Sequence, residues 1–284
     1  YLKVSPVRYI RVSGMAGAAL WLPGILLGNA YLMCAATVLT ALVGGAIIPM
    51  ILHLSCEQYP ENTLLSFEKA IDFGVDMLEL DINVSSDGQL VIIHDLTVDR
   101  TTNGTGAVRS LNLPELKRLD AGIRKSEEFR GQAIPTLEEF CQLMVAHPQV
   151  LLNVEIKDRT EECVDKTISI LAKYNLIPLC VFACFDADIV KYISRKHHLP
   201  TQGFPGFKMQ HFEPGLNGTF SHMTAVGIEM SLLTPERVVD YEEMGILPWA
   251  YCPDTEKSAA YARYCGAWLV TANNPGPAMA IFRG

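Results

Sequence analysis

The sequence predicts an α/β protein whose main part is a (β/α)8 (TIM) barrel, preceded by an N-terminal hydrophobic membrane segment. Two observations carry this prediction. After residue 56, short apolar or β-branched runs alternate with helix-like segments, as in a parallel sheet covered by helices. Before that point, no Asp, Glu, Lys or Arg occurs from Gly14 to Leu52. We therefore expect a basic and hydrophobic leader over residues 1–46 and a barrel domain over residues 47–284.

The N-terminal apolar run is long enough to cross a membrane. A helical span needs about 20 apolar residues, so the run holds one span, or two as a tight hairpin. Lys3, Arg8 and Arg11 precede it, and the positive-inside rule then keeps the N-terminus in the cytoplasm. One span would place the barrel outside the cytoplasm, and two would place it inside. A cleaved signal peptide, whose apolar region has about 7–15 residues, and a buried core segment are the alternatives.

The rest of the chain is acidic. The 284 residues have a net charge of −8, and residues 1–56 contribute +3, which leaves −11 for residues 57–284. Because a protein that binds nucleic acid needs a basic face for the phosphate backbone, we expect no nucleic-acid partner. The 8 cysteines show no CxxC spacing, so the sequence indicates neither a zinc site nor a disulfide framework.

The predicted strands begin at residues 47–52, the end of the N-terminal apolar run. Seven further strand signals follow, at 76–84, 90–95, 150–157, 179–185, 225–230, 247–252 and 267–272. Helix signals alternate with them, at 62–73, 113–119, 136–145, 160–173, 187–196, 234–244 and 254–265. Thr136 and Glu139 have capping-box spacing, and Pro235 suits the first turn after Thr234. The length and number of units favour a closed barrel of about 250 residues over an open sheet. No GxGxxG follows the first strand, which argues against a dinucleotide-binding fold.

Two acidic residues share one face of the predicted strand at 76–84. Side chains alternate along a strand, so Glu79 and Asp81 point to the same side, about 6–7 Å apart. We expect both to point into the barrel, with Leu78 and Leu80 packing outward on helices. Buried carboxylates are unfavourable unless they are paired or bind a metal. Ion-paired structural acids are one interpretation, and two oxygen ligands for a hard divalent cation are the other.

The predicted strand at 150–157 repeats this alternation with Asn153, Glu155 and Lys157. Glu155 would add a third carboxylate, and Lys157 a cation one strand step away. Three carboxylates and a lysine suit a metal-bound phosphate, because the metal and the ammonium offset its negative charge. A salt bridge would explain any single member of the group, but it fits less well with the same alternation of acids on two strands.

His94 closes the apolar run LVIIHD. In a barrel of this type the chemistry lies at the C-terminal ends of the strands, and the pKa of histidine lies near neutrality. His94 is therefore a candidate general acid or base. The loop that follows, Asp99 to Gly106, is rich in turn residues, and loops at this rim commonly contact substrate.

Together these stretches resemble the glycerophosphodiester phosphodiesterase family. The matching stretches are PENTLLSFEKAIDFGVDMLELDINVSSDGQLVIIHDLTVDRTTNGTG (60–106), LNLPELKRLDAG (111–122), IPTLEEF (134–140), NVEIK (153–157) and, more weakly, GILPWAYC (245–252) and VTANNP (270–275). The resemblance implies a TIM barrel that hydrolyses glycerophosphodiesters to glycerol 3-phosphate and an alcohol, and hence a phosphoric diester hydrolase. Its implied substrate is a glycerophosphodiester or a lysophospholipid-type molecule.

The resemblance also implies roles for particular residues. Glu79, Asp81 and Glu155 correspond to ligands of one divalent cation, Mg²⁺ or Ca²⁺. Lys157 corresponds to a lysine on the phosphate side of the site. His94 corresponds to a catalytic histidine.

The first strand departs from the family pattern of His-Arg-Gly. Here the residues are His53, Leu54 and Ser55, so a second catalytic histidine is expected at His53 while the phosphate-binding arginine is absent. This departure supports an alternative function, a catalytically impaired barrel that binds a metal or a phosphorylated ligand. A third possibility is a relative of phospholipase D that forms a phosphorylated or cyclic lipid. Near the C-terminus, Trp249 begins the stretch Trp-Ala-Tyr-Cys where the family often has Trp-Thr-Val-Asn. Trp249 would either line the substrate pocket or pack in the core.

Overall fold

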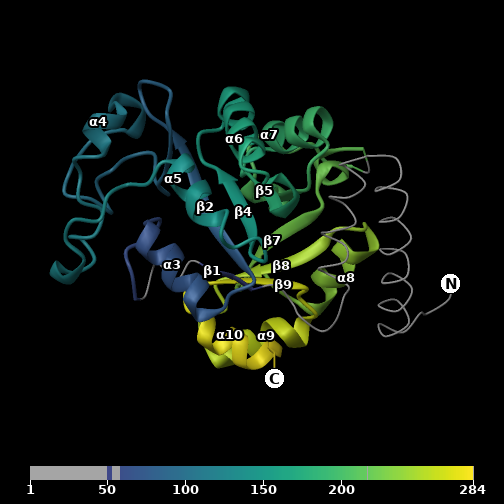
Figure 1. Ribbon diagram of the computed structural model, residues 1–284. Helices are drawn as coiled ribbons and strands as arrows, with labels where there is room; N and C mark the ends of the chain where they lie inside the picture. The colour runs from purple at the N-terminus through teal and green to yellow at the C-terminus, as the bar shows by residue number, and fades with distance from the viewer. Residues whose placement is uncertain (1–49, 53–57, 216, 284) are drawn as a thin grey trace.

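The computed structural model describes residues 50–52, 58–215 and 217–283. Within them, eight parallel strands form a closed barrel (Figure 1). The strands are β1 (Met50–Leu52), β2 (Met77–Val84), β4 (Leu151–Ile156), β5 (Cys180–Ala183), β6 (Thr201–Gly203), β7 (Ala225–Glu229), β8 (Leu247–Tyr251) and β9 (Leu269–Ala272). Each pairs with the next in this order, and β9 pairs with β1 to close the ring. The predicted barrel is therefore confirmed.

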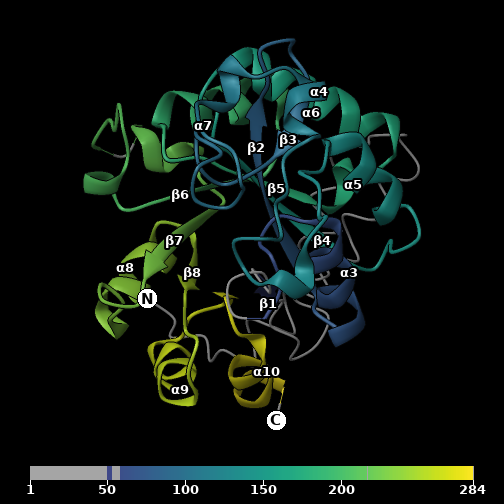
Figure 2. The same cartoon turned by 90° about the vertical axis from the view of Figure 1, so that its left-hand side faces the viewer.

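One predicted barrel strand is wrong. The run at 90–95 forms only a short strand, β3 (Leu90–Ile92), which is antiparallel to β2 and lies outside the closed ring (Figure 2). The eighth barrel strand is instead β6, which has only three residues and no apolar run to reveal it. Hydrophobic periodicity needs several residues to be visible, and a strand this short shows none.

After β3 the chain makes an excursion over the barrel rim before it returns at α5. Its elements are the 3-10 turns η1 (Val108–Ser110) and η2 (Glu127–Phe129) and the short helix α4 (Leu113–Leu116). The excursion projects to one side of the barrel (left in Figure 1). It has a small hydrophobic core of its own, formed by Val91, Ile93, Val98, Val108, Leu116, Ala121 and Ile134.

Helices surround the barrel. They are α3 (Leu64–Phe73), α5 (Leu137–Met144), α6 (Glu161–Lys173), α7 (Ala187–Tyr192), α8 (Pro235–Glu243), α9 (Glu256–Cys265) and α10 (Pro275–Arg283). The expected capping box joins Thr136 and Glu139, and Thr234 caps the helix that begins at Pro235. The helix α7 ends earlier than predicted and continues as one π-helical turn, η4 (Ile193–His197). Sequence reasoning missed α10, because two prolines and a glycine occupy its first turn.

The two faces of the strands have different surroundings. Leu78, Leu80 and Ile82 of β2 point outward and belong to the main core between barrel and helices, as predicted. Inside the barrel, an apolar layer with Met77 and Leu269 fills the end where the strands begin. Polar side chains take over toward the ends of the strands, so the fold places its polar interior where a barrel of this type carries its chemistry.

The predicted leader over residues 1–46 lies outside the described residues. In the part of the chain that the structure describes, no helix is both long and apolar enough to cross a bilayer.

Candidate active site

Three carboxylates meet at the C-terminal end of the barrel. Glu79 and Asp81 come from β2 and Glu155 from β4, and one ligand oxygen of each lies within 4.8 Å of the others. All three are buried, and Asp81 is fully enclosed. The register explains the meeting, because Asp81 stands opposite Glu155 in the parallel ladder. The predicted inward orientation and convergence of these acids thus agree with the geometry.

Lys157 lies among these acids. Its Nζ is 2.6 Å from Glu155 Oε1 and 3.2 Å from Asp81 Oδ1. Burial disfavours the charged lysine, but the charges of Asp81 and Glu155 outweigh that effect and raise its pKa. Burial raises the pKa of Glu155 to about 7, because the attraction of Lys157 does not offset burial together with the repulsion from Asp81 and Glu79.

The donor set fits a divalent cation. When ionised, the three carboxylates carry −3 and Lys157 carries +1, so a charge of −2 remains buried at one point. Such a charge is unfavourable in a protein interior unless a cation balances it. Carboxylate oxygens are the ligands that Mg²⁺ and Ca²⁺ prefer.

Two asparagines support this centre, and neither was singled out from the sequence. Asn62, in the loop before α3, is buried and donates from Nδ2 to Asp81 Oδ2 over 2.7 Å. Its backbone is left-handed, with φ 54°, a conformation that asparagine adopts more readily than most residues. Asn83 follows two residues after Asp81, and its Nδ2 donates to the carbonyl oxygens of Ile93 and Asp95.

His94 lies at the mouth of the site, with 46 % of its side chain exposed. Its Nδ1 is 2.7 Å from Asp95 Oδ1. Hydrogen bonds from Arg100, and a smaller effect of His94, lower the pKa of Asp95 to about 2 although partial burial opposes this. The ionised Asp95 can only accept, so Nδ1 of His94 carries the proton and Nε2 is left for other partners.

A cavity of about 390 Å³ joins these groups. Its polar and charged lining consists of Glu61, Glu79, His94, Arg100, Asn153, Glu155, Lys157, Gln202, Thr271 and Asn273. Phe185, Phe204 and Tyr251 line it as well; the first two rings stack at a centroid distance of 3.5 Å, and the third meets Phe204 edge-on. The cavity therefore combines a charged floor with an aromatic wall.

Asn153 lines the cavity and has one buried polar atom without a hydrogen-bond partner among the described residues. Its Nδ2 donates to Gln202 Oε1 over 2.9 Å, whereas its buried Oδ1 has no hydrogen-bond partner among the described residues.

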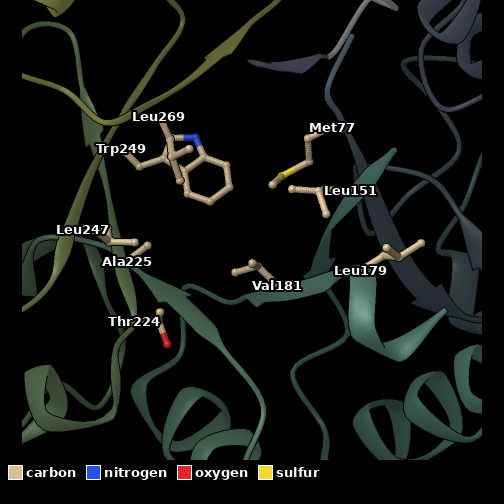
Figure 3. A pocket seen from close by; sticks show the side chains of 9 residues that line it. All are labelled: Met77, Leu151, Leu179, Val181, Thr224, Ala225, Leu247, Trp249 and Leu269. Atoms are coloured by element: carbon tan, nitrogen blue, oxygen red, sulfur yellow. The ribbon is translucent and has the colours of Figure 1, made fainter. Parts of the chain in front are cut away.

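The structure does not bring Trp249 to this cavity. Its fully buried indole lines a separate apolar cavity of about 20 Å³, with Leu269 beside it and Met77 and Leu151 opposite (Figure 3). The indole N–H donates to Thr271 Oγ1 over 2.8 Å. Side chains alternate along β8, so Trp249 and Tyr251 both point into the barrel. Tyr251 lies nearer the C-terminal end of the strand and lines the larger cavity, whereas Trp249 packs in the layer beneath it. His53 lies outside the described residues.

A second group of possible metal ligands lies at the start of α7 and in the segment after β6. Asp186, Asp188 and His211 bring ligand atoms within 4.8 Å of one another. Asp186 already caps α7 and pairs with His211 Nδ1 at 3.0 Å, and the other two side chains are mostly exposed. Ordinary ion pairing accounts for this group.

Comparisons with known proteins give the family and the fold of this chain. Residues 55–275 match the model of the glycerophosphoryl diester phosphodiesterase family. A glycerophosphodiester phosphodiesterase of Caldanaerobacter subterraneus is 42% identical over 130 residues, which cover 45% of this chain and 53% of that protein. The matched part thus spans about half the length of such curated relatives.

Solved structures are similar over most of the barrel. A glycerophosphodiester phosphodiesterase of Agrobacterium tumefaciens aligns with a TM-score of 0.70 at 20% identity, covering 81% of this chain and 98% of the other. An Oleispira antarctica phosphodiesterase, solved in complex with the product sn-glycerol-3-phosphate, aligns with a TM-score of 0.72 at 25% identity, covering 83% and 96%. With its matching barrel and the family match over residues 55–275, this chain belongs to the glycerophosphoryl diester phosphodiesterase family.

Proposed function

We propose that this chain hydrolyses glycerophosphodiesters to glycerol 3-phosphate and an alcohol, with the help of a divalent cation. The observation that carries the proposal is the cluster of three buried carboxylates beside Lys157, at the floor of a cavity whose mouth holds His94. The family to which the chain belongs supports the reaction class.

Glu79, Asp81 and Glu155 would hold the cation, Mg²⁺ or Ca²⁺. When bound, it would offset negative charge on the phosphate oxygens. Lys157 would contribute further positive charge on the same side. The side chain of Asn153, which lines the cavity, would contact the glycerol moiety.

His94 would move the proton that the reaction requires. Attack on phosphorus by water forms one P–O bond, and the P–O bond to the alcohol breaks. If a glycerol hydroxyl attacks instead, the alcohol leaves and a cyclic phosphate forms; water must then attack this phosphorus and break one P–O bond of the ring to give glycerol 3-phosphate. The departing alcohol oxygen must gain a proton. Asp95 holds Nδ1 of the ring, so Nε2 of His94 would donate that proton or accept one from the nucleophile. His53, predicted as the second histidine of this exchange, keeps that role as a proposal.

A non-catalytic role remains the second candidate. The observation that favours it is the stretch His53-Leu54-Ser55, which lacks the arginine and glycine of the family pattern. A barrel of this kind would still bind a cation or a phosphorylated ligand through the carboxylate cluster.

One experiment separates the two. Release of glycerol 3-phosphate from glycerophosphocholine is measured with Mg²⁺, with Ca²⁺ and with EDTA, and cation binding is measured by calorimetry. Hydrolysis that is lost in EDTA, in Glu155→Gln and in His94→Ala supports the enzyme, with Arg283→Gln as a control far from the cavity. Cation binding without turnover supports the second candidate. Product mass identifies a phosphorylated or cyclic lipid, which would point to phospholipase D-type chemistry on a lysophospholipid-type substrate.

We further propose that residues 1–46 anchor the barrel domain, residues 47–284, to a membrane. The support is the run without Asp, Glu, Lys or Arg from Gly14 to Leu52. The full chain should float with lipid vesicles in a density gradient and resist extraction with alkaline carbonate. Full extraction by carbonate would refute the anchor, and protease protection of the barrel would identify its side of the membrane.

A further inference from the structure

Arg100, in the loop after β3, holds two carboxylates at once. Its Nη1 and Nη2 donate to the two oxygens of Glu61 over 2.8 and 2.6 Å. Its Nε and Nη2 donate to the two oxygens of Asp95 over 2.8 and 3.0 Å. These contacts use four of the five N–H donors of a guanidinium group. Arg100 therefore links the loop before α3 to the loop that carries His94.

The residues around His94 continue this linkage. Asp95 also binds Nδ1 of the imidazole, at 2.7 Å. Asn83 holds the main chain from the other side, because its Nδ2 donates to the carbonyls of Ile93 and Asp95, the residues that flank His94. The backbone on both sides of His94 is thus fixed by Asn83 of β2, whereas Asp95 holds its ring.

Because His94 is exposed, its ring depends on the hydrogen bond to Asp95 for a fixed orientation. With 46 % of the side chain exposed, packing restricts the ring little, and an unrestrained side chain would populate several rotamers. Asp95 can restrain the ring only if its own carboxylate is fixed. A planar guanidinium that binds both oxygens of a carboxylate fixes its orientation, which a lysine cannot do.

We propose that Arg100 is a positioning residue: anchored by Glu61, it fixes the carboxylate of Asp95 so that the ring of His94 keeps Nε2 available to the catalytic cavity. The inference rests on the proposed function, because it takes His94 as the acid or base. It differs from a direct phosphate contact, the role that an arginine lining this cavity would otherwise suggest. The charge of Arg100 is already matched by its two carboxylate partners.

A double-mutant cycle tests the proposal. Arg100→Gln is made alone and together with His94→Ala, and kcat and KM are measured for glycerophosphocholine with the preferred cation. Arg283→Gln is the matched control, because it removes another arginine–carboxylate pair, at 2.6 Å from Asp76, beside the start of β2. Circular dichroism checks that each variant is folded. The imidazole ¹⁵N resonances, assigned with His94→Ala, report the ring of His94 independently of turnover.

We expect Arg100→Gln to lower kcat on the order of 10- to 100-fold with little change in KM. In the His94→Ala background the same change should have less than about a twofold effect, because the two residues act as one unit. The ¹⁵N spectrum of His94 should change from one tautomer, protonated at Nδ1, to a mixture, and Arg283→Gln should leave it unaltered.

Three results would overturn the proposal. They are a raised KM with unchanged kcat, an equal loss in both backgrounds, and an unchanged ¹⁵N spectrum of His94 in Arg100→Gln. Absence of turnover in the wild-type protein would refute the proposed function instead, and the ¹⁵N spectra would still decide whether Arg100 positions the ring.

Discussion

Replacement of Asn62 tests the geometry that holds Asp81. Asn62 is only 4% exposed, and its Nδ2 donates to Asp81 Oδ2 over 2.7 Å. A hydrogen bond to a charged group contributes about 1.5–3 kcal/mol. We therefore expect Asn62→Gly, which keeps the backbone but loses the bond, to lower the free energy of unfolding of the metal-free protein by about 2 kcal/mol.

Asn62→Ala adds the effect of the backbone. The φ of 54° is left-handed, which disfavours alanine by about 1–2 kcal/mol. In the unfolded chain glycine has more conformational entropy than alanine, which disfavours folding of the glycine variant by about 0.4–1 kcal/mol relative to the alanine variant. The alanine variant should thus be less stable than the glycine variant by about 1 kcal/mol.

The assay is urea unfolding in EDTA, followed by titration with Mg²⁺ or Ca²⁺. Loss of the contact to Asp81 should weaken cation binding by about 10- to 100-fold in both variants. Asn175 is the matched control, because it is exposed, lies outside the site and has a similar φ of 59°. Its Gly and Ala variants should differ in stability in the same way without any change in cation affinity. If Asn62→Gly had the same stability and the same cation affinity as the wild-type protein, the inferred role of the hydrogen bond to Asp81 would be refuted.

Three further predictions concern pH and the pocket. Hydrogen bonds from Arg100 lower the pKa of Asp95 from 3.8 to about 2. The ionised Asp95 therefore stabilises the folded protein, and this stabilisation is lost as the pH falls from about 4 to about 2. In Asp95→Asn the melting temperature should depend less on pH over this range. Burial raises the pKa of Glu155 from 4.5 to about 7, so without a cation stability should fall as the pH rises through this range. Glu155→Gln should remove that dependence in EDTA and abolish stabilisation by added cation; an unchanged pH profile would contradict the assignment. Trp249→Phe should lower the free energy of unfolding by about 1–2 kcal/mol through its lost hydrogen bond but leave KM unaltered, whereas Tyr251→Leu should raise KM. Steady-state kinetics that showed the reverse would place the indole in the pocket.

Side-chain alternation was sufficient to predict that the three acids converge. Strands keep a period of two, so Glu79 and Asp81 had to share a face, and Asn153 and Glu155 had to share a face on another strand. A parallel barrel then brings the ends of both strands to one rim. The barrel itself followed from strands and helices long enough to show their periods.

What the sequence could not show depends on contacts between distant segments. The bond between Arg100 and Glu61 joins residues 39 positions apart, and no local pattern reveals it. The predicted direction of β3 was wrong for a related reason. An apolar run has the same composition in an antiparallel hairpin as in a parallel barrel, so the run alone does not show which strand it pairs with. The place of the Trp249 side chain was ambiguous from the sequence. A shift of one residue along a strand moves a side chain from the inside of the barrel to the outside, and a shift of two residues moves it to another layer of the interior.

The hairpin of β2 and β3 has a consequence for exchanging segments between relatives. The strand β2 carries two of the carboxylates and β3 leads into His94. The two lie side by side, because the Asp81 carbonyl accepts a hydrogen bond from the Ile93 amide over 2.9 Å. A chimera that moves residues 77–95 as one block would therefore transfer the acid pair and the histidine with their mutual spacing intact. Glu155 and Lys157 would come from the recipient barrel, so the joint between donor and recipient would run through the middle of the carboxylate cluster.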